Sequence, residues 1–122
     1  MEPYAVTSND ITKNDLDILR WVRERIRLLP NGRTCHEVCE SLAMQSSIMA
    51  IEPHLSSLTL VHVRGYFARK GWDHSWLLIP NRPILIDPYP WCCGSGPILV
   101  YTGGILNPWR DLYIPEPIEG KT

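Results

Sequence analysis

The stretch that decides the fold is HSWLLIPNRPILID, residues 74–87. Residues 75–79 and 83–86 are rich in branched and aromatic side chains, which favour β-strands. Between them stands Pro-Asn-Arg-Pro, residues 80–83, a composition typical of a tight turn. The stretch therefore predicts an antiparallel β-hairpin.

The register of this hairpin follows from its loop. A two-residue loop at the centre of the turn sets Trp76 opposite Asp87. His74 shares a sheet face with Trp76, so it becomes a diagonal neighbour of Asp87, about 5.5–8 Å away between backbones. A slip of one residue would put the two on opposite faces, so their contact depends on this turn.

Before residue 58, the sequence pattern indicates helices. Thr12, with Asp15 three residues later, resembles a capping box that opens a helix over residues 12–29. A second helix is expected from about Cys35 to about Ile48, capped by Thr34. The apolar stripe of the first helix consists of Leu16, Leu19, Val22, Ile26 and Leu29.

Further strands are predicted at residues 58–67 and 98–101. Helices come first and strands follow, which predicts an α+β fold with the N-terminal helices packed on a small antiparallel sheet. With 122 residues we expect one domain over 1–122, with a core at about 31–103. Residues 1–10 and 114–122 are expected to be flexible or extended.

Composition excludes several classes of protein. The chain has 44% hydrophobic and 20% charged residues, which is typical of a folded globule. A net charge of −1 offers no general field for nucleic acid or anionic lipid, and no glycine-rich phosphate loop occurs. We expect no cofactor, no nucleic-acid partner and no membrane partner.

The sequence also bears on the compartment. No apolar run approaches the ~20 residues of a membrane span, and the N-terminal residues lack the pattern of a secretion signal. We expect a cytoplasmic protein, or an effector delivered without a classical signal. The four cysteines, of which Cys92 and Cys93 are adjacent, are then expected to be reduced.

Three residues have the chemistry of a nucleophilic triad. Cys35 is expected at a helix N-terminus, where the positive end of the helix dipole favours the thiolate. His74 would form an ion pair with it, and Asp87 would orient the imidazole. Cys39, one turn further along, is the fallback nucleophile. Asp73 could replace Asp87, but it should point to the opposite sheet face.

These residues stand in segments that resemble a known family. Gly-Arg-Thr-Cys at 32–35, Val-Arg-Gly-Tyr at 63–66, Asp-His-Ser-Trp at 73–76 and Leu-Ile-Asp-Pro at 85–88 are similar to the transglutaminase-like core of the papain-like cysteine enzymes. The resemblance spans about residues 31–90. It departs from the usual pattern before and after the cysteine, where Gly32 is three residues upstream and His36 follows.

The resemblance implies acyl transfer at an amide bond through a thioester, with a peptide or protein as substrate. It leaves open whether the product arises by hydrolysis, deamidation or cross-linking. The oxyanion donors would be the backbone N–H of Cys35 and the Asn31 side chain. Trp76, Trp91 and Trp109 could line the acyl site beside a loop at residues 88–97.

Two other classes of function compete with this interpretation. Cys35, His36, Cys39, Cys92 and Cys93 could hold zinc in an interaction module, although their spacing is unlike that of a zinc knuckle. Alternatively, the chain is an inactive relative that only binds a partner. His54 and His62 are interpreted as structural.

Overall fold

The computed structural model describes part of the chain in detail. The described residues are 11–30, 32–48, 58–67, 72–89, 96–103 and 112–115. The predictions for residues 1–10, Asn31, Trp91, Cys92, Cys93, Trp109 and 116–122 lie outside them.

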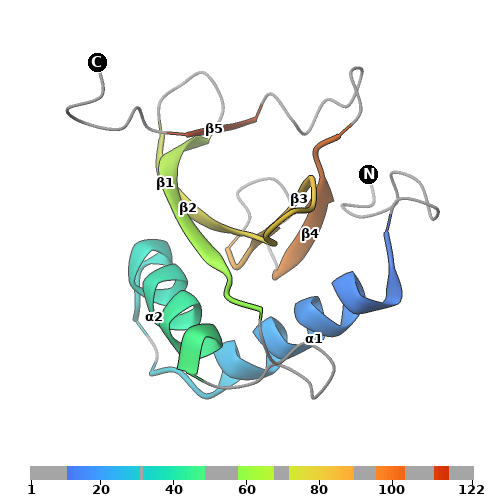
Figure 1. Cartoon of the computed structure of the whole chain (residues 1–122). Coiled ribbons are helices and arrows are strands. Elements are labelled where there is room, and N and C mark those ends of the chain that lie inside the picture. The colour runs from blue at the N-terminus through green and yellow to red at the C-terminus, as the bar shows by residue number, and fades with distance from the viewer. Residues whose placement is uncertain are drawn as a thin grey trace.

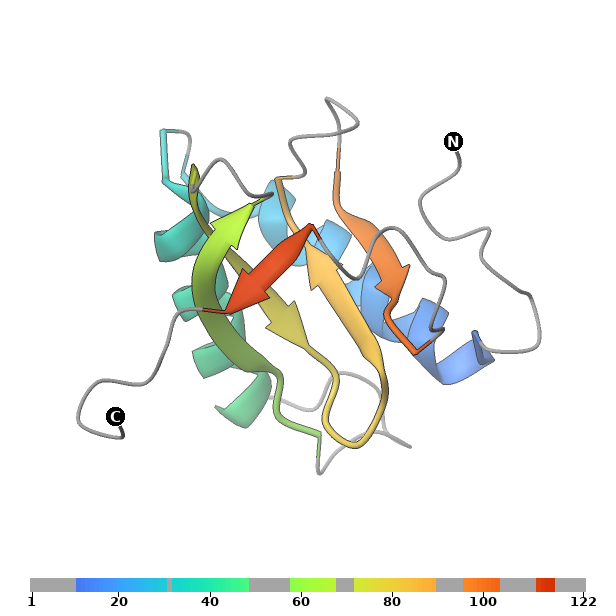
Figure 2. The same ribbon diagram turned by 90° about the horizontal axis from the view of Figure 1, so that it is seen from above.

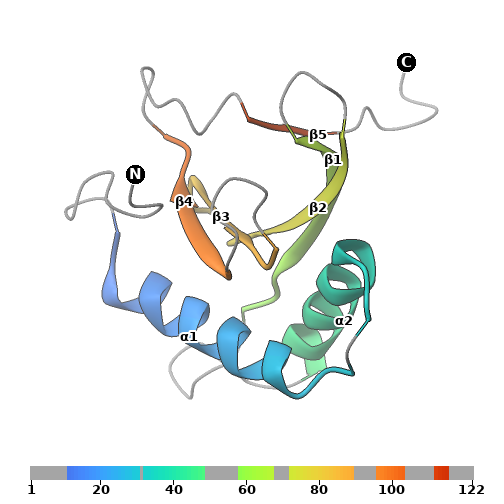
Figure 3. The same ribbon diagram turned by 180° about the vertical axis from the view of Figure 1, so that it is seen from behind.

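The fold is α+β, as the sequence predicts. Two N-terminal helices pack beneath a curled antiparallel sheet (Figure 1). The strand order across the sheet is β4-β3-β2-β1-β5, and Figure 3 shows the curl from behind. The elements are α1 (Lys13–Arg27), α2 (Cys35–Ile48), β1 (Val61–Phe67), β2 (Trp72–Leu78), β3 (Ile84–Asp87), β4 (Ile98–Tyr101) and β5 (Tyr113–Pro115).

The start of α1 has the predicted cap. The Thr12 hydroxyl accepts from the backbone N–H of Asp15, and the Asp15 carboxylate accepts from the backbone N–H of Thr12. The predicted apolar stripe is wrong at Leu16, which is 46% exposed. Leu16 lies roughly 120° around the helix from Val22, outside the buried face. Ile18 and Trp21 complete that face instead.

The main core lies between the helices and the sheet. α2 contributes Val38, Cys39 and Leu42, all of them buried. Thr34 caps this helix: its hydroxyl accepts from the backbone N–H of Glu37, and the Glu37 carboxylate accepts from the backbone N–H of Thr34. The first turn of α2 is therefore fixed locally.

The predicted register of the hairpin is confirmed. Leu77 pairs with Ile86 and Leu78 pairs with Leu85, and extending this register sets Trp76 level with Asp87. The turn between the strands includes Asn81 at φ 64°, a left-handed conformation that asparagine tolerates better than most residues.

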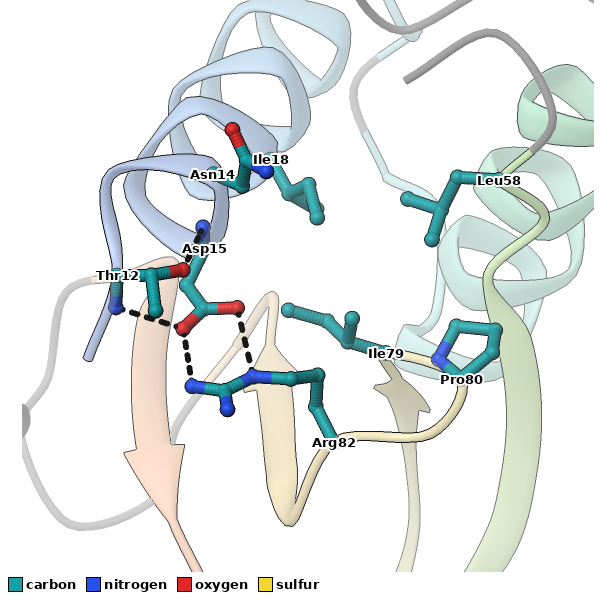
Figure 4. A pocket seen from close by; sticks show the side chains of 8 residues that line it. All are labelled: Thr12, Asn14, Asp15, Ile18, Leu58, Ile79, Pro80 and Arg82. Carbon is teal, nitrogen blue, oxygen red and sulfur yellow. Dashed lines mark hydrogen bonds and ion pairs between the residues drawn. The ribbon is translucent and has the colours of Figure 1, made fainter. Parts of the chain in front are cut away.

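An ion pair fixes the turn to the start of α1. Arg82 donates through Nε and Nη2 to the two carboxylate oxygens of Asp15, at 3.3 and 2.7 Å (Figure 4). Asp15 is 2% exposed, so this ion pair is largely shielded from water. The carboxylate that caps α1 thus also holds the β2–β3 turn, which lies far away in the sequence.

The second, smaller core lies on the sheet face turned away from the helices. It contains Phe67, Trp76, Leu85, Val100 and Tyr113 among others. Its last member belongs to β5, an edge strand that the sequence did not predict and that pairs antiparallel with β1 (Figure 2). Ile114 and Pro115, placed by prediction in the C-terminal tail, are extended in this strand.

Close contact between β5 and its neighbours depends on one glycine. A Cβ atom at Gly65 would collide with the backbone oxygen of Ile114 and with the Trp76 ring. Glycine at this position lets β5 approach the sheet closely enough to deliver Tyr113 to the second core.

The pairing of β2 with β3 stops before it reaches the start of β2. Within the described residues, their ladder ends at Leu77 and Ile86 and does not continue to Asp87. Residues of β2 alternate between faces, with Leu77 in the main core and Trp76 in the second. His74 and Asp87 both lie beyond this last pair, at the end of the ladder.

Within the described part of the chain, neither helix is long and apolar enough to cross a membrane.

Candidate functional site

The candidate site is built around a buried imidazole. The Nε2 atom of His74 lies 2.8 Å from the Oδ2 atom of Asp87. Both residues are 0% exposed. A carboxylate can only accept hydrogen bonds, so Nε2 carries a hydrogen and donates it to Asp87. The contact expected from the hairpin register is therefore formed.

Two further donors hold the Asp87 carboxylate. The Tyr113 hydroxyl donates to Oδ2 at 2.7 Å, and the backbone N–H of Tyr89 donates to Oδ1 at 3.0 Å. Sequence reasoning missed Tyr113, because it lies beyond the predicted core and carries no motif. The only signal was a tyrosine beside branched residues near the C-terminus.

Aromatic rings enclose the imidazole of His74. The ring centroids of Phe67, Trp76 and Tyr113 lie 5.9, 6.1 and 6.3 Å from it. These rings exclude water from the His74–Asp87 pair, and this strengthens its electrostatic attraction.

Cys35 approaches the imidazole from the helix layer. It is the first residue of α2, is partly exposed, and has a free thiol that lies close enough to His74 to raise the pKa of that imidazole. Because Nε2 is bonded to Asp87, Nδ1 is the ring nitrogen left for the thiol. The contact lies where β2 and β3 separate, so α2 and the two strands together bring Cys35, His74 and Asp87 into one chain of contacts.

The partners of His74 favour its charged form. Burial alone lowers the pKa of His74, but the hydrogen bonds to Asp87 and Cys35 and the charges of both groups outweigh it. The net result raises the pKa of His74 to about 9. At neutral pH the imidazole is therefore protonated, as required of the cation in a thiolate–imidazolium pair.

Cys39 is a poor alternative to Cys35. It is 0% exposed, and burial raises the pKa of its thiol far above the usual range, with the charges of Asp87 and Cys35 adding to the effect. Its thiol stays protonated and inaccessible, which argues against a role as nucleophile.

Asp73 also lies outside the chain of contacts. Its side chain is 55% exposed, and its carboxylate binds Arg64 and His36. Asp73 and Asp87 therefore lie beside different histidines, in line with the alternation of side chains along β2.

Trp76 is one of the residues expected to line the acyl site. The residue is 1% exposed and is part of the second core. Its ring packs beside those of His74 and Tyr113, so the contact that the structure shows for Trp76 is with the candidate site's own residues. Asn31, Trp91 and Trp109, the other residues expected to contact substrate, lie outside the described residues.

Among the described residues, no group of three or more histidine, cysteine or acidic side chains is arranged to hold a metal ion. Cys92 and Cys93, which the zinc interpretation needs, are outside these residues. A pocket of about 290 Å³ lies at the other end of β2, between Ile18, Leu58 and Arg82 (Figure 4). It contains none of the predicted site residues.

No family model, no curated protein and no solved structure matches this chain.

Proposed function

We propose that this chain is a cysteine-dependent acyl-transfer enzyme with a transglutaminase-like, papain-like core, acting on an amide bond of a peptide or protein. The observation that carries the proposal is the contact of Cys35, at the start of α2, with a buried His74 whose other ring nitrogen is bonded to Asp87. The sequence resemblance, which rests on the segments that contain these three residues, also supports it.

In the proposed reaction, the Cys35 thiolate attacks the carbonyl carbon of the amide, forming a C–S bond and a tetrahedral oxyanion. The backbone N–H of Cys35, which has no partner within its own helix at this position, is one candidate donor to that oxyanion. Collapse of the intermediate breaks the C–N bond, and the imidazolium of His74 gives its Nδ1 proton to the leaving amine.

The second half of the reaction uses the same imidazole as a base. Neutral His74 accepts a proton from water or from an amine, whose oxygen or nitrogen then attacks the thioester. The C–S bond breaks and the Cys35 thiolate is restored beside the imidazolium. Asp87 keeps the hydrogen of His74 on Nε2 throughout, so Nδ1 always faces the sulfur.

A reactive free thiol is preserved best in a reducing compartment, which favours the cytoplasm as the place of action. We expect no metal or organic cofactor in this chemistry, because a thiolate, an imidazole and a carboxylate suffice for it.

The test is alkylation of each cysteine by iodoacetamide as a function of pH, resolved by peptide mass spectrometry. In the wild type, Cys35 should react near neutral pH at least about tenfold faster than an ordinary thiol. His74→Ala should remove this advantage. Cys39→Ala is the matched control on the same helix and should leave the reactivity of Cys35 in place.

Substrate chemistry is tested next with peptide amides and glutamine-containing peptides. The expected result is an acyl-enzyme of increased mass at Cys35, which hydroxylamine releases. Ordinary reactivity at all four thiols would overturn the proposal in favour of a binding domain. Reactivity that appears only after a chelator is added would instead support the zinc interpretation.

A further inference from the structure

A second polar cluster lies on the helix-facing side of β2, directly beside the candidate site. Its centre is Ser75, which is 0% exposed. The Ser75 hydroxyl contacts two imidazoles, His36 Nδ1 at 2.5 Å and His62 Nε2 at 2.8 Å. His36 Nε2 lies 3.0 Å from Asp73 Oδ2. We call Asp73, His36, Ser75 and His62 the Ser75 cluster.

The hydrogen bonds of the Ser75 cluster have one direction when both imidazoles are neutral. The Asp73 carboxylate only accepts, so His36 donates from Nε2 and its Nδ1 must accept. Ser75 therefore donates its hydroxyl hydrogen to His36, and its oxygen accepts from His62 Nε2. Each of the three contacts then has one donor and one acceptor.

The Asp–His–Ser order resembles a serine nucleophile with its base, but the position of Ser75 argues against that role. The residue is fully buried, and imidazoles occupy both sides of its oxygen. A substrate carbonyl has no path to it. The contacts instead join three elements: His36 belongs to α2, His62 to β1, and Ser75 and Asp73 to β2.

These links share their elements with the proposed catalytic contact. His36 follows Cys35 in α2, and Ser75 follows His74 in β2. We propose that the Ser75 cluster is a positioning device that fixes the first turn of α2 on β2, holding Cys35 against His74, and that it opens when His36 and His62 are both protonated. The role in Cys35 reactivity rests on the proposed function, whereas the docking of α2 does not.

Double protonation is what the Ser75 cluster cannot accommodate. If His36 alone is charged, its Nδ1 donates to Ser75 and the hydroxyl donates to neutral His62, so the chain reverses and remains complete. If both are charged, two cations donate to one oxygen, and the serine hydrogen loses its acceptor in the cluster. Like charges at this separation also repel.

The surroundings place this event on the acidic side of neutrality. Burial lowers the pKa of His62, and the charges of His36 and Arg64 lower it further, against an opposing effect of Glu40 on α2. Burial is the largest single influence on the pKa of Asp73 and raises it, but the hydrogen bonds and charges of Arg64 and His36 together outweigh burial and lower this pKa below its usual value. Asp73 is thus charged at neutral pH, and protonation of His62 requires an acidic pH.

The decisive variants are Ser75→Ala and Ser46→Ala. Ser46 is a matched control: it is also buried, and it also links α2 to the sheet side, because its hydroxyl accepts from the backbone N–H of Leu60. Two readouts are needed at pH 5–8: alkylation of Cys35, and hydrogen exchange of the Val38 amide, which bonds to the Thr34 carbonyl in the first turn of α2.

We expect Ser75→Ala to slow Cys35 alkylation at pH 7.5 about fivefold to tenfold and to speed first-turn exchange by a similar factor, as loss of a buried hydrogen bond implies. Ser46→Ala should change neither the alkylation of Cys35 nor the first-turn exchange, even if it lowers the melting temperature as much as Ser75→Ala does. His36→Asn, whose carbonyl can accept from Ser75 without gaining charge, should keep Cys35 alkylation near the wild-type rate. It should also remove the extra acceleration of first-turn exchange that we expect in the wild type below about pH 6.

Each outcome has a separate meaning. Unchanged exchange in Ser75→Ala, or equal effects from Ser46→Ala, would overturn the positioning device. Faster exchange with unchanged Cys35 alkylation would overturn its link to the reaction. Failure of the proposed function would be seen in a different experiment: His74→Ala would leave the alkylation rate of Cys35 unchanged.

Discussion

The surroundings of two histidines on adjacent strands, His74 in β2 and His62 in β1, shift their pKa values in opposite directions. His74 is fully buried with Asp87, and its pKa is raised to about 9. His62 is half-buried beside the neutral Ser75 hydroxyl, and burial lowers its pKa. Burial disfavours the charged form of both, so the nature of the partner decides the outcome. One side of β2 stabilises an imidazolium, and the other stabilises a neutral imidazole.

Asp87→Asn should break this contrast with the largest effect. The amide oxygen cannot satisfy His74, Tyr113 and the Tyr89 backbone together, and it carries no charge. We expect a loss of about 3–5 kcal/mol in the free energy of unfolding, as for other broken buried ion pairs. Urea denaturation at pH 7 measures it.

The same variant should also abolish the enhanced alkylation of Cys35, because His74 loses the carboxylate that holds it protonated. The comparison of the two histidines would be wrong if Asp87→Asn retained wild-type stability and Cys35 reactivity together.

The pH dependence of stability sharpens the contrast, because the two histidines have opposite signs. The folded pKa of His74 lies above the ordinary 6.5, so its contribution to stability is complete below about pH 6.5 and is lost as pH rises through 9. The loss should reach roughly 3 kcal/mol. The folded pKa of His62 lies below 6.5, so its contribution is complete above that pH and is lost as the pH falls.

Denaturation at intervals from pH 4.5 to 9.5 should therefore give a maximum of stability near pH 6–7. His74→Gln should flatten the alkaline side and His62→Gln the acidic side. If one variant flattened both sides, the separation of the two environments would not hold.

Tyr113→Phe should give the smallest effect. It removes one hydroxyl that donates to Asp87 and keeps the ring in the second core. We expect a cost of about 1 kcal/mol, as for one hydrogen bond, with slower alkylation of Cys35. Tyr89→Phe is the control, because Tyr89 reaches Asp87 through its backbone and not its ring. Equal effects of the two variants would contradict the assigned role of the Tyr113 hydroxyl.

Much of the fold could be predicted because local signals agree with the tertiary arrangement. Thr12 and Thr34 cap helices in the way their neighbours predict, and the turn at residues 80–83 fixes the register that joins His74 to Asp87. These inferences need only residues close in sequence and the alternation of side chains in strands.

The remaining parts depend on contacts between distant segments that have no local pattern. Tyr113 contributes through a three-residue edge strand, too short for periodicity to indicate it. His36 and His62 meet on Ser75 only because α2 and β1 both lie against β2, so neither had a visible partner in the sequence. Trp76 was expected to line the acyl site, and its burial in the second core depends on Tyr113 of β5, a contact between segments distant in sequence.

The attachment of β5 to β1 has a consequence for the order of folding. Tyr113 stands 26 residues from the carboxylate that it holds and 78 residues from Cys35, counted along the chain. Closing such long loops is slow compared with forming a helix or a hairpin. If Cys35 is the nucleophile we propose, it should therefore become fully activated late, after β5 has docked. An emerging chain would carry an ordinary thiol at Cys35 until β5 is in place.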